Sequence, residues 1–223
     1  MRAGTLALVL LVAACAAPDA ADDADAGAEN AAMDATALPA EIESIKSAND
    51  KYQDVNTALA EGFIEDPSGM CVTATEVGAP AELGNMGIHY ISLQGLGVNL
   101  PPGAGPPPPG VRLDGTDGVI DPMRPEVLVY EPTSDGGRTL VGIEYLVFKQ
   151  AWEAAGNTAP PSVGGQEFYL MADDPATEMD EAHGFEPHYE LHVWTHRPNP
   201  SGLFAEWNPA VTCPPMAAGG ASR

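Results

Sequence analysis

Three ionisable residues lie inside apolar segments, where each polar side chain needs a partner. His89 follows Met-Gly-Ile, Glu144 lies in the apolar segment 140–148, and His192 lies in segment 189–195. A buried polar group without a hydrogen bond costs several kcal/mol. A buried carboxylate needs a cation, a metal ion or a raised pKa. These three residues are therefore the first candidates for chemistry.

Two imidazoles and one carboxylate form a ligand set that suits Zn, Cu(II) or non-heme Fe(II). His188, His192 and His196 cannot share one ion on a strand, because residues four apart lie about 13 Å apart. The ligands must then come from different strands, and we predict a metal site at His89, Glu144 and His192. Alternation predicts one polar and aromatic strand face, made of His188, Glu190, His192, Trp194 and His196.

Two other interpretations fit the same pattern. In the first, a metal-free pocket lined by Tyr90, Tyr145 and Trp194 binds a small apolar or carbohydrate ligand. In the second, the buried histidines and Glu144 form a hydrogen-bond network that only stabilises the fold. The chain has no HExxH, CxxC, Gly-x-Ser-x-Gly, phosphate-binding or dinucleotide-binding motif, so whether it is an enzyme stays open.

The elements that must position these residues can be predicted from periodicity. Apolar residues recur at helical spacing over 38–63, which predicts one amphipathic helix. Asp135-Gly136-Gly137 predicts a hairpin turn. The fold class expected is α+β, with the helix packed on a largely antiparallel curved sheet or half-barrel. Strands are predicted from β-branched and aromatic runs at 88–93, 127–130, 139–149, 167–171 and 189–195.

The N-terminus has the features of an export signal. Arg2 precedes an apolar segment at 6–12, and small residues then lead into Cys15. Val-Ala-Ala-Cys resembles the site read by the bacterial lipoprotein peptidase. This resemblance implies a signal peptide at 1–14 and a lipidated Cys15, and Ala16 after the cysteine implies the outer membrane. The partner expected is therefore the membrane, reached through the lipid anchor, with the folded part in the periplasm or at the cell surface.

The remaining chain divides into two predicted parts. Residues 15–37 carry the anchor and an acidic, Ala-rich tether that is too polar to fold. Residues 38–223 suffice for a single globular domain. With Cys15 lipidated, Cys71 and Cys213 are the only pair left for a disulfide bond in an oxidising compartment. The net charge of -23 argues against nucleic-acid binding, which needs a basic surface.

Several segments resemble an uncharacterised family of exported bacterial proteins. The resemblance covers about residues 50 to 213 and implies one domain, but it assigns no activity and no catalytic residue. Asn199-Pro and Asn208-Pro are typical of turns that place Phe204 and Trp207 near the sheet. The segments that carry the resemblance are Met-Gly-Ile-His-Tyr (86–90), Pro-Glu-Val-Leu-Val-Tyr-Glu-Pro (125–132), Leu-Val-Gly-Ile-Glu-Tyr-Leu-Val (140–147), Leu-His-Val-Trp (191–194) and the segment from Asn199 to Cys213.

Overall fold

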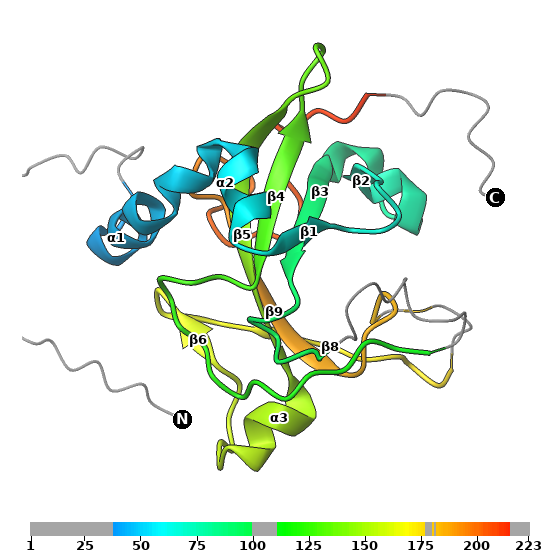
Figure 1. Cartoon of the computed structure of the whole chain (residues 1–223). Helices are drawn as coiled ribbons and strands as arrows, with labels where there is room; N and C mark the ends of the chain where they lie inside the picture. The colour runs from blue at the N-terminus through cyan, green and yellow to red at the C-terminus, as the bar shows by residue number, and fades with distance from the viewer. Residues whose placement is uncertain (1–37, 100–110, 177–179, 181, 215–223) are drawn as a thin grey trace, which may run out of the picture. The chain divides into compact units, whose positions relative to one another are not determined.

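A mostly antiparallel sheet is the centre of the structure, a computed structural model that describes residues 38–99, 111–176, 180 and 182–214 (Figure 1). Within these ranges the sheet has the strand order β1-β3-β4-β5-β9-β8, and β2 pairs with β3. The fold class is α+β, as predicted. The signal peptide and tether predicted for 1–37 lie outside the described residues. The strands are β1 (Phe63–Glu65), β2 (Val72–Thr73), β3 (Asn85–Ser92), β4 (Val127–Pro132), β5 (Arg138–Phe148), β6 (Ser162–Val163), β7 (Gln166–Glu167), β8 (Tyr169–Met171) and β9 (His188–Val193).

The predicted strands are confirmed where the apolar runs are longest. Strands β3, β4, β5 and β9 occupy the predicted segments with ends shifted by a few residues, and the hairpin forms between β4 and β5. Gly136 has a φ of +85° at its tip, which a glycine adopts without strain. The segment predicted as one strand at 167–171 instead divides between β7 and β8.

The prediction of a single N-terminal helix over 38–63 is wrong, because the segment is not one continuous helix. The segment forms α1 (Ala40–Asn49), a 3-10 turn η1 (Asp50–Gln53) and α2 (Val55–Ala60). Asp54 is extended, and its side chain accepts a hydrogen bond from the backbone N–H of Asn56. A helix N-cap of this kind satisfies a free backbone donor, so Asp54 starts a new helix instead of continuing the old one. The other helical elements are α3 (Lys149–Ala154), η2 (Ala74–Val77) and η3 (Ala81–Leu83).

The sheet has two different buried faces. One packs against the N-terminal helices, since Ile42 and Ile45 of α1 share an apolar cluster with sheet residues that include Tyr90 and Tyr145. The other face carries His89, Glu144 and His192 among smaller apolar clusters. Neighbouring residues of a strand point to opposite faces, so alternate positions along each strand belong to the helix-covered face and to the face that carries the histidines.

A disulfide bond ties the residue just before β2 to the C-terminal segment of the described chain. Cys71 and Cys213 are bonded, as predicted, across a sequence separation of 142 residues. The C-terminal segment packs closely beside them, where Asn208 bridges to Asn85 at the start of β3. A Cβ atom on Gly84 would lie 2.3 Å from the Cα atom of Pro209, so only glycine fits there.

Candidate metal centre

Strand pairing places the three candidate ligands on one face of the sheet. Glu144 on β5 lies directly opposite His192 on β9. On its other side Glu144 pairs with Val127 of β4, which in turn pairs with Ile91 of β3. His89 lies two residues before Ile91 and so shares its face. The imidazole of His89 must therefore reach across β4 to approach Glu144.

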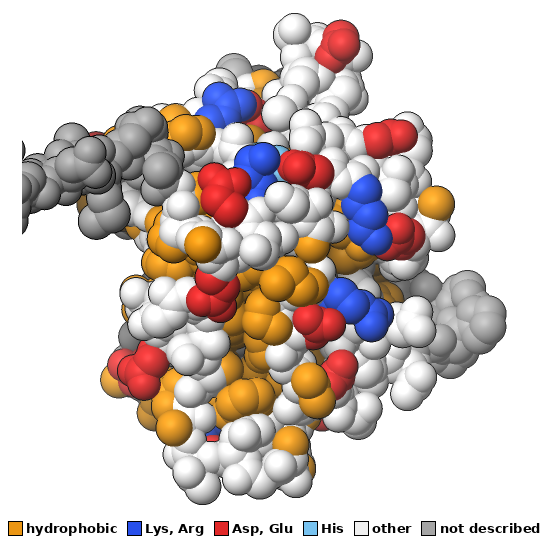
Figure 2. Space-filling model, turned by 90° about the vertical axis from the view of Figure 1, so that its left-hand side faces the viewer, with side chains coloured by type: hydrophobic (Ala, Val, Ile, Leu, Met, Phe, Trp, Pro, Cys, Tyr) orange, Lys and Arg blue, Asp and Glu red, His pale blue; other side chains and the backbone are white. Residues whose placement is uncertain are grey.

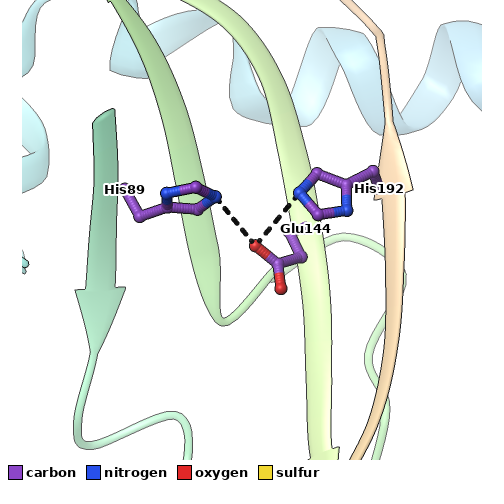
Figure 3. A group of neighbouring side chains, drawn as sticks. All are labelled: His89, Glu144 and His192. Carbon is purple, nitrogen blue, oxygen red and sulfur yellow. Dashed lines mark ion pairs between the residues drawn. The ribbon is translucent and has the colours of Figure 1, made fainter. Parts of the chain in front are cut away.

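The three side chains converge at their polar tips (Figure 3). Oε2 of Glu144 lies 3.5 Å from Nε2 of His89 and 3.5 Å from Nε2 of His192. One ligand atom from each residue lies within 4.8 Å of the other two. Two ligands bound at about 2.0–2.2 Å to one tetrahedral ion lie roughly 3.4 Å apart. The group could therefore hold a metal ion with little movement.

Burial keeps both imidazoles in the form that binds metals. Desolvation lowers the pKa of His89 to about 4, and the pKa of His192 is lowered for the same reason. Burial, followed by the nearby Glu190, raises the pKa of Glu144 well above its usual value. The contacts at 3.5 Å have the spacing of ion pairs, but burial opposes the charged forms of both the imidazoles and the carboxyl group. Nε2 of His192 is buried and has no hydrogen-bond partner.

Further side chains on β9 support the group. The indole of Trp194 stacks on the His192 ring, with centroids 6.1 Å apart, and its N–H donates to the carbonyl of Ala205 at 2.6 Å. Nε2 of His188 lies 3.4 Å from Oε2 of Glu190. Burial opposes the charge on Glu190, but the hydrogen bond with His188 and the nearby His192, His188 and His183 together outweigh it and lower the Glu190 pKa to about 2. The ring of His192 is thus held in a fixed orientation.

A pocket of about 340 Å³ adjoins the three candidate ligands, which form part of its lining. One wall comes from segment 66–77 and from Trp207, and another comes from the loop that carries His183 and Phe185. Arg112 holds this loop by donating to the carbonyl of Phe185 and to the carboxylate of Asp180. The candidate centre therefore has an accessible side.

The structure does not bring together the other predicted pocket residues. Tyr90 and Tyr145 belong to the opposite face, where their hydroxyls donate to Glu65 and to the carbonyl of Pro122. Trp194 packs in a separate cluster with Val129 and Val141. Because Tyr90 and Tyr145 directly follow His89 and Glu144 in the chain, strand alternation turns them away from the metal group.

One further grouping is wrong. His196 does not share the face of His192, since its Nε2 lies 3.0 Å from Oδ1 of Asp50. Strand β9 ends at Val193, and the alternation therefore stops before His196. Sequence reasoning did not assign a role in the pocket to Phe185, Glu206, His183 and Trp207, which lie outside the strands. His188 and Glu190 line the pocket beside His192, in agreement with their predicted place on the same strand face.

Comparison with protein-family models, with curated proteins and with solved structures gives no match. Among the described helices, none is both long and apolar enough to cross a membrane. The site is therefore interpreted from its own geometry.

Proposed function

We propose that this chain is an exported lipoprotein whose domain binds one transition-metal ion through His89, Glu144 and His192. A single observation carries the proposal: ligand atoms from three strands lie within 4.8 Å of one another, and one of them, Nε2 of His192, is buried without a hydrogen-bond partner. A purely structural hydrogen-bond network would not leave that nitrogen free. A bound cation would accept its lone pair and would offset the cost of ionising Glu144.

Three protein ligands beside an open pocket are typical of metal sites that bind an exchangeable water or substrate. A metal bound here would supply Lewis-acid or redox chemistry, with Zn, Cu and Fe all compatible with the ligand set. We also propose that the sheet is curved, because a concave face would let His89 reach Glu144 over β4. The Val-Ala-Ala-Cys segment ending at Cys15 supports lipidation, Ala16 after it supports an outer-membrane location, and the disulfide bond suits an oxidising compartment. Membership of the exported family resembled in sequence is part of the same proposal.

Calorimetric titration of chelator-treated protein with Zn²⁺, Cu²⁺ and, under anaerobic conditions, Fe²⁺ tests the metal site. We expect one ion to bind at submicromolar concentration, and His89→Ala, Glu144→Gln and His192→Ala each to weaken binding by at least about 100-fold. His196→Ala is the matched control, since His196 lies outside the group. Folded wild-type protein that binds none of these ions at micromolar concentration would overturn the proposal.

The anchor needs a separate measurement. Mass spectrometry of the protein extracted from membranes should find acyl chains on Cys15 as the first residue. Cys15→Ser should release the protein from the membrane fraction, because its attachment would be lost. An unmodified Cys15 in membrane-extracted protein would contradict the lipoprotein assignment.

A further inference from the structure

The described lining of the pocket combines carboxyl groups with four histidines, His89, His183, His188 and His192, and contains no permanently cationic side chain. Among the described residues that line it are Asp66, Glu190 and Glu206 in addition to Glu144, and no Lys or Arg is present. Glu190 is buried at the sheet, whereas Glu206 is exposed on the C-terminal segment. A phosphate, sulfate or carboxylate ligand would meet like charge here and would find no guanidinium or ammonium partner. The lining therefore disfavours anions.

Six of the seven described basic residues form ion pairs outside the pocket, and the seventh, Arg124, does not line it either. Figure 2 shows one face on which the Lys and Arg side chains lie beside acidic ones. These contacts on the protein surface fix the cations at positions where they do not line the pocket. Ion pairs within the described ranges involve Lys46, Lys51, Arg112, Arg138, Lys149 and Arg197.

A bound metal ion would not reverse the sign of the pocket. A divalent ion that is bound by ionised Glu144 keeps one unit of positive charge. The carboxylates of Asp66, Glu190 and Glu206 outweigh that charge. The negative net charge of the whole chain acts in the same direction, because it raises the local concentration of cations.

The rest of the lining is apolar and includes two aromatic rings. Trp207 packs with Met86 and Ala74 at one side of the pocket. Phe185 belongs to a different cluster, where its ring lies beside Phe148 and His188. Aromatic faces attract organic cations, and apolar side chains bind the carbon body of the same ligand. Small hydrated inorganic ions would gain nothing from these surfaces.

We propose that the ligand admitted beside the metal is a small organic cation, with an ammonium head and a short apolar body. The inference rests on the proposed function, since it assigns His89, Glu144 and His192 to the metal and leaves the remaining pocket to this ligand. Glu190 and Glu206 supply the charge that selects the ammonium group. Trp207 and Phe185 contact its alkyl groups and body.

Three probes of nearly the same shape test this selection: choline, neutral 3,3-dimethyl-1-butanol and anionic 3,3-dimethylbutanoate. Choline has a quaternary nitrogen, which cannot coordinate a metal through that atom. Binding is measured by calorimetry or ligand-observed NMR on the full mature protein, both chelator-treated and metal-loaded. We expect choline to bind at least about 10-fold more tightly than the alcohol, and the anion to bind least.

Variants then assign the preference to the pocket. Glu190→Gln and Glu206→Gln should each reduce the choline-to-alcohol ratio several-fold, and the exposed Glu206 can be replaced without disturbing the core. Glu82→Gln, an exposed acid outside the pocket, is the control. Equal binding of all three probes, preferred binding of the anion, or no binding of any probe would overturn the inference. The metal titration is done without probe, so failure of metal binding is detected separately from failure of cation selection.

Discussion

Two buried carboxyl groups, at Glu126 and Glu144, illustrate different reasons for retaining an acid in an apolar interior. Glu144 belongs to the candidate metal group, where a bound cation would compensate the ionised carboxylate. Oε2 of Glu126 instead accepts a hydrogen bond from the backbone N–H of Leu146 at 3.2 Å. This contact satisfies a donor of β5 near the point where its pairing with β4 ends at Glu144. Glu126 therefore has a structural role.

Glu126 should make the stability of the protein depend on pH. Burial raises its pKa from 4.5 to about 8, so between these values the folded state holds a proton that the unfolded state has released. Its contribution to stability is fully present below pH 4.5 and is lost as pH rises through about 8. The integrated effect is at most about 5 kcal/mol, an upper value for one buried group.

Urea unfolding of wild-type protein and of Glu126→Gln between pH 5 and 9 measures this effect. The amide of the variant stays neutral and its oxygen can still accept from Leu146. We expect the variant to match the wild type at pH 5 and to exceed its free energy of unfolding at pH 9. Parallel pH profiles for the two proteins would show that Glu126 does not titrate in this range.

At the scale of the elements, Gly142 on β5 controls the position of the His192 ring. A Cβ atom at Gly142 would lie 3.0 Å from the carbonyl oxygen of Val193 and 3.2 Å from Cε3 of Trp194. Trp194 stacks on His192, so a displacement of the indole is passed to the imidazole. The close approach of β5 and β9 here therefore affects both packing and the candidate metal group.

Gly142→Ala should lower the free energy of unfolding by about 1–2 kcal/mol, as expected for overpacking. It should also weaken metal binding by about 10-fold, because a ligand is displaced. Thr139→Ala, at an exposed position on the same strand, is the control for the loss of strand propensity. Calorimetric metal titration of both variants measures the metal affinity, and urea unfolding measures the free energy of unfolding. If Gly142→Ala is destabilised but binds metal with unchanged affinity, the packing at Gly142 does not affect the position of the candidate metal ligands.

Regular strands made much of the fold predictable from sequence. In β5 every residue from Leu140 to Phe148 is buried, and an uninterrupted apolar run predicts that situation directly. The helix break at Asp54 was missed because the apolar spacing continues across it, while the competing side-chain cap is a local effect. The predicted metal-free pocket of Tyr90, Tyr145 and Trp194 ignored strand alternation, which puts the two tyrosines and Trp194 on different faces of the sheet.

The walls of the pocket could not be predicted in the same way. His183, Phe185 and Glu206 come from loops, which have no periodicity to indicate the direction of a side chain. Their positions depend on distant contacts, such as the hydrogen bond from Arg112 to the carbonyl of Phe185. The three candidate ligands could be predicted from the sequence, because each is a polar residue that interrupts an apolar strand.

At the scale of the whole molecule, the Cys71–Cys213 disulfide bond should matter more for the pocket than for the metal group. Met70 and Val72, on either side of Cys71, line the pocket, whereas the three candidate ligands lie on central strands. Replacing both cysteines by serine should lower the free energy of unfolding by about 2–5 kcal/mol, since it frees the unfolded chain.

In the double cysteine variant, metal affinity should stay within about 3-fold of the wild type, because β3, β5 and β9 still hold the ligands. Choline binding should weaken more than metal binding, because the pocket wall that contains Met70 and Val72 loses its covalent attachment to the C-terminal segment. Unfolding curves and the two titrations on the same preparation compare these effects. Equal weakening of both ligands would mean that the disulfide bond also positions the sheet.

The late position of Cys213, the second partner of the disulfide bond, makes the wall of the pocket the last part to be assembled. A chain that emerges N-terminus first exposes His89 early, Glu144 later, and His192 only when nearly all of the described chain is out. Glu206, Trp207 and Cys213 follow still later, and they complete the wall. An N-terminal fragment that stops before His192 thus lacks one of the three candidate ligands. On the proposed function, the complete ligand set would form only after most of the described chain has emerged.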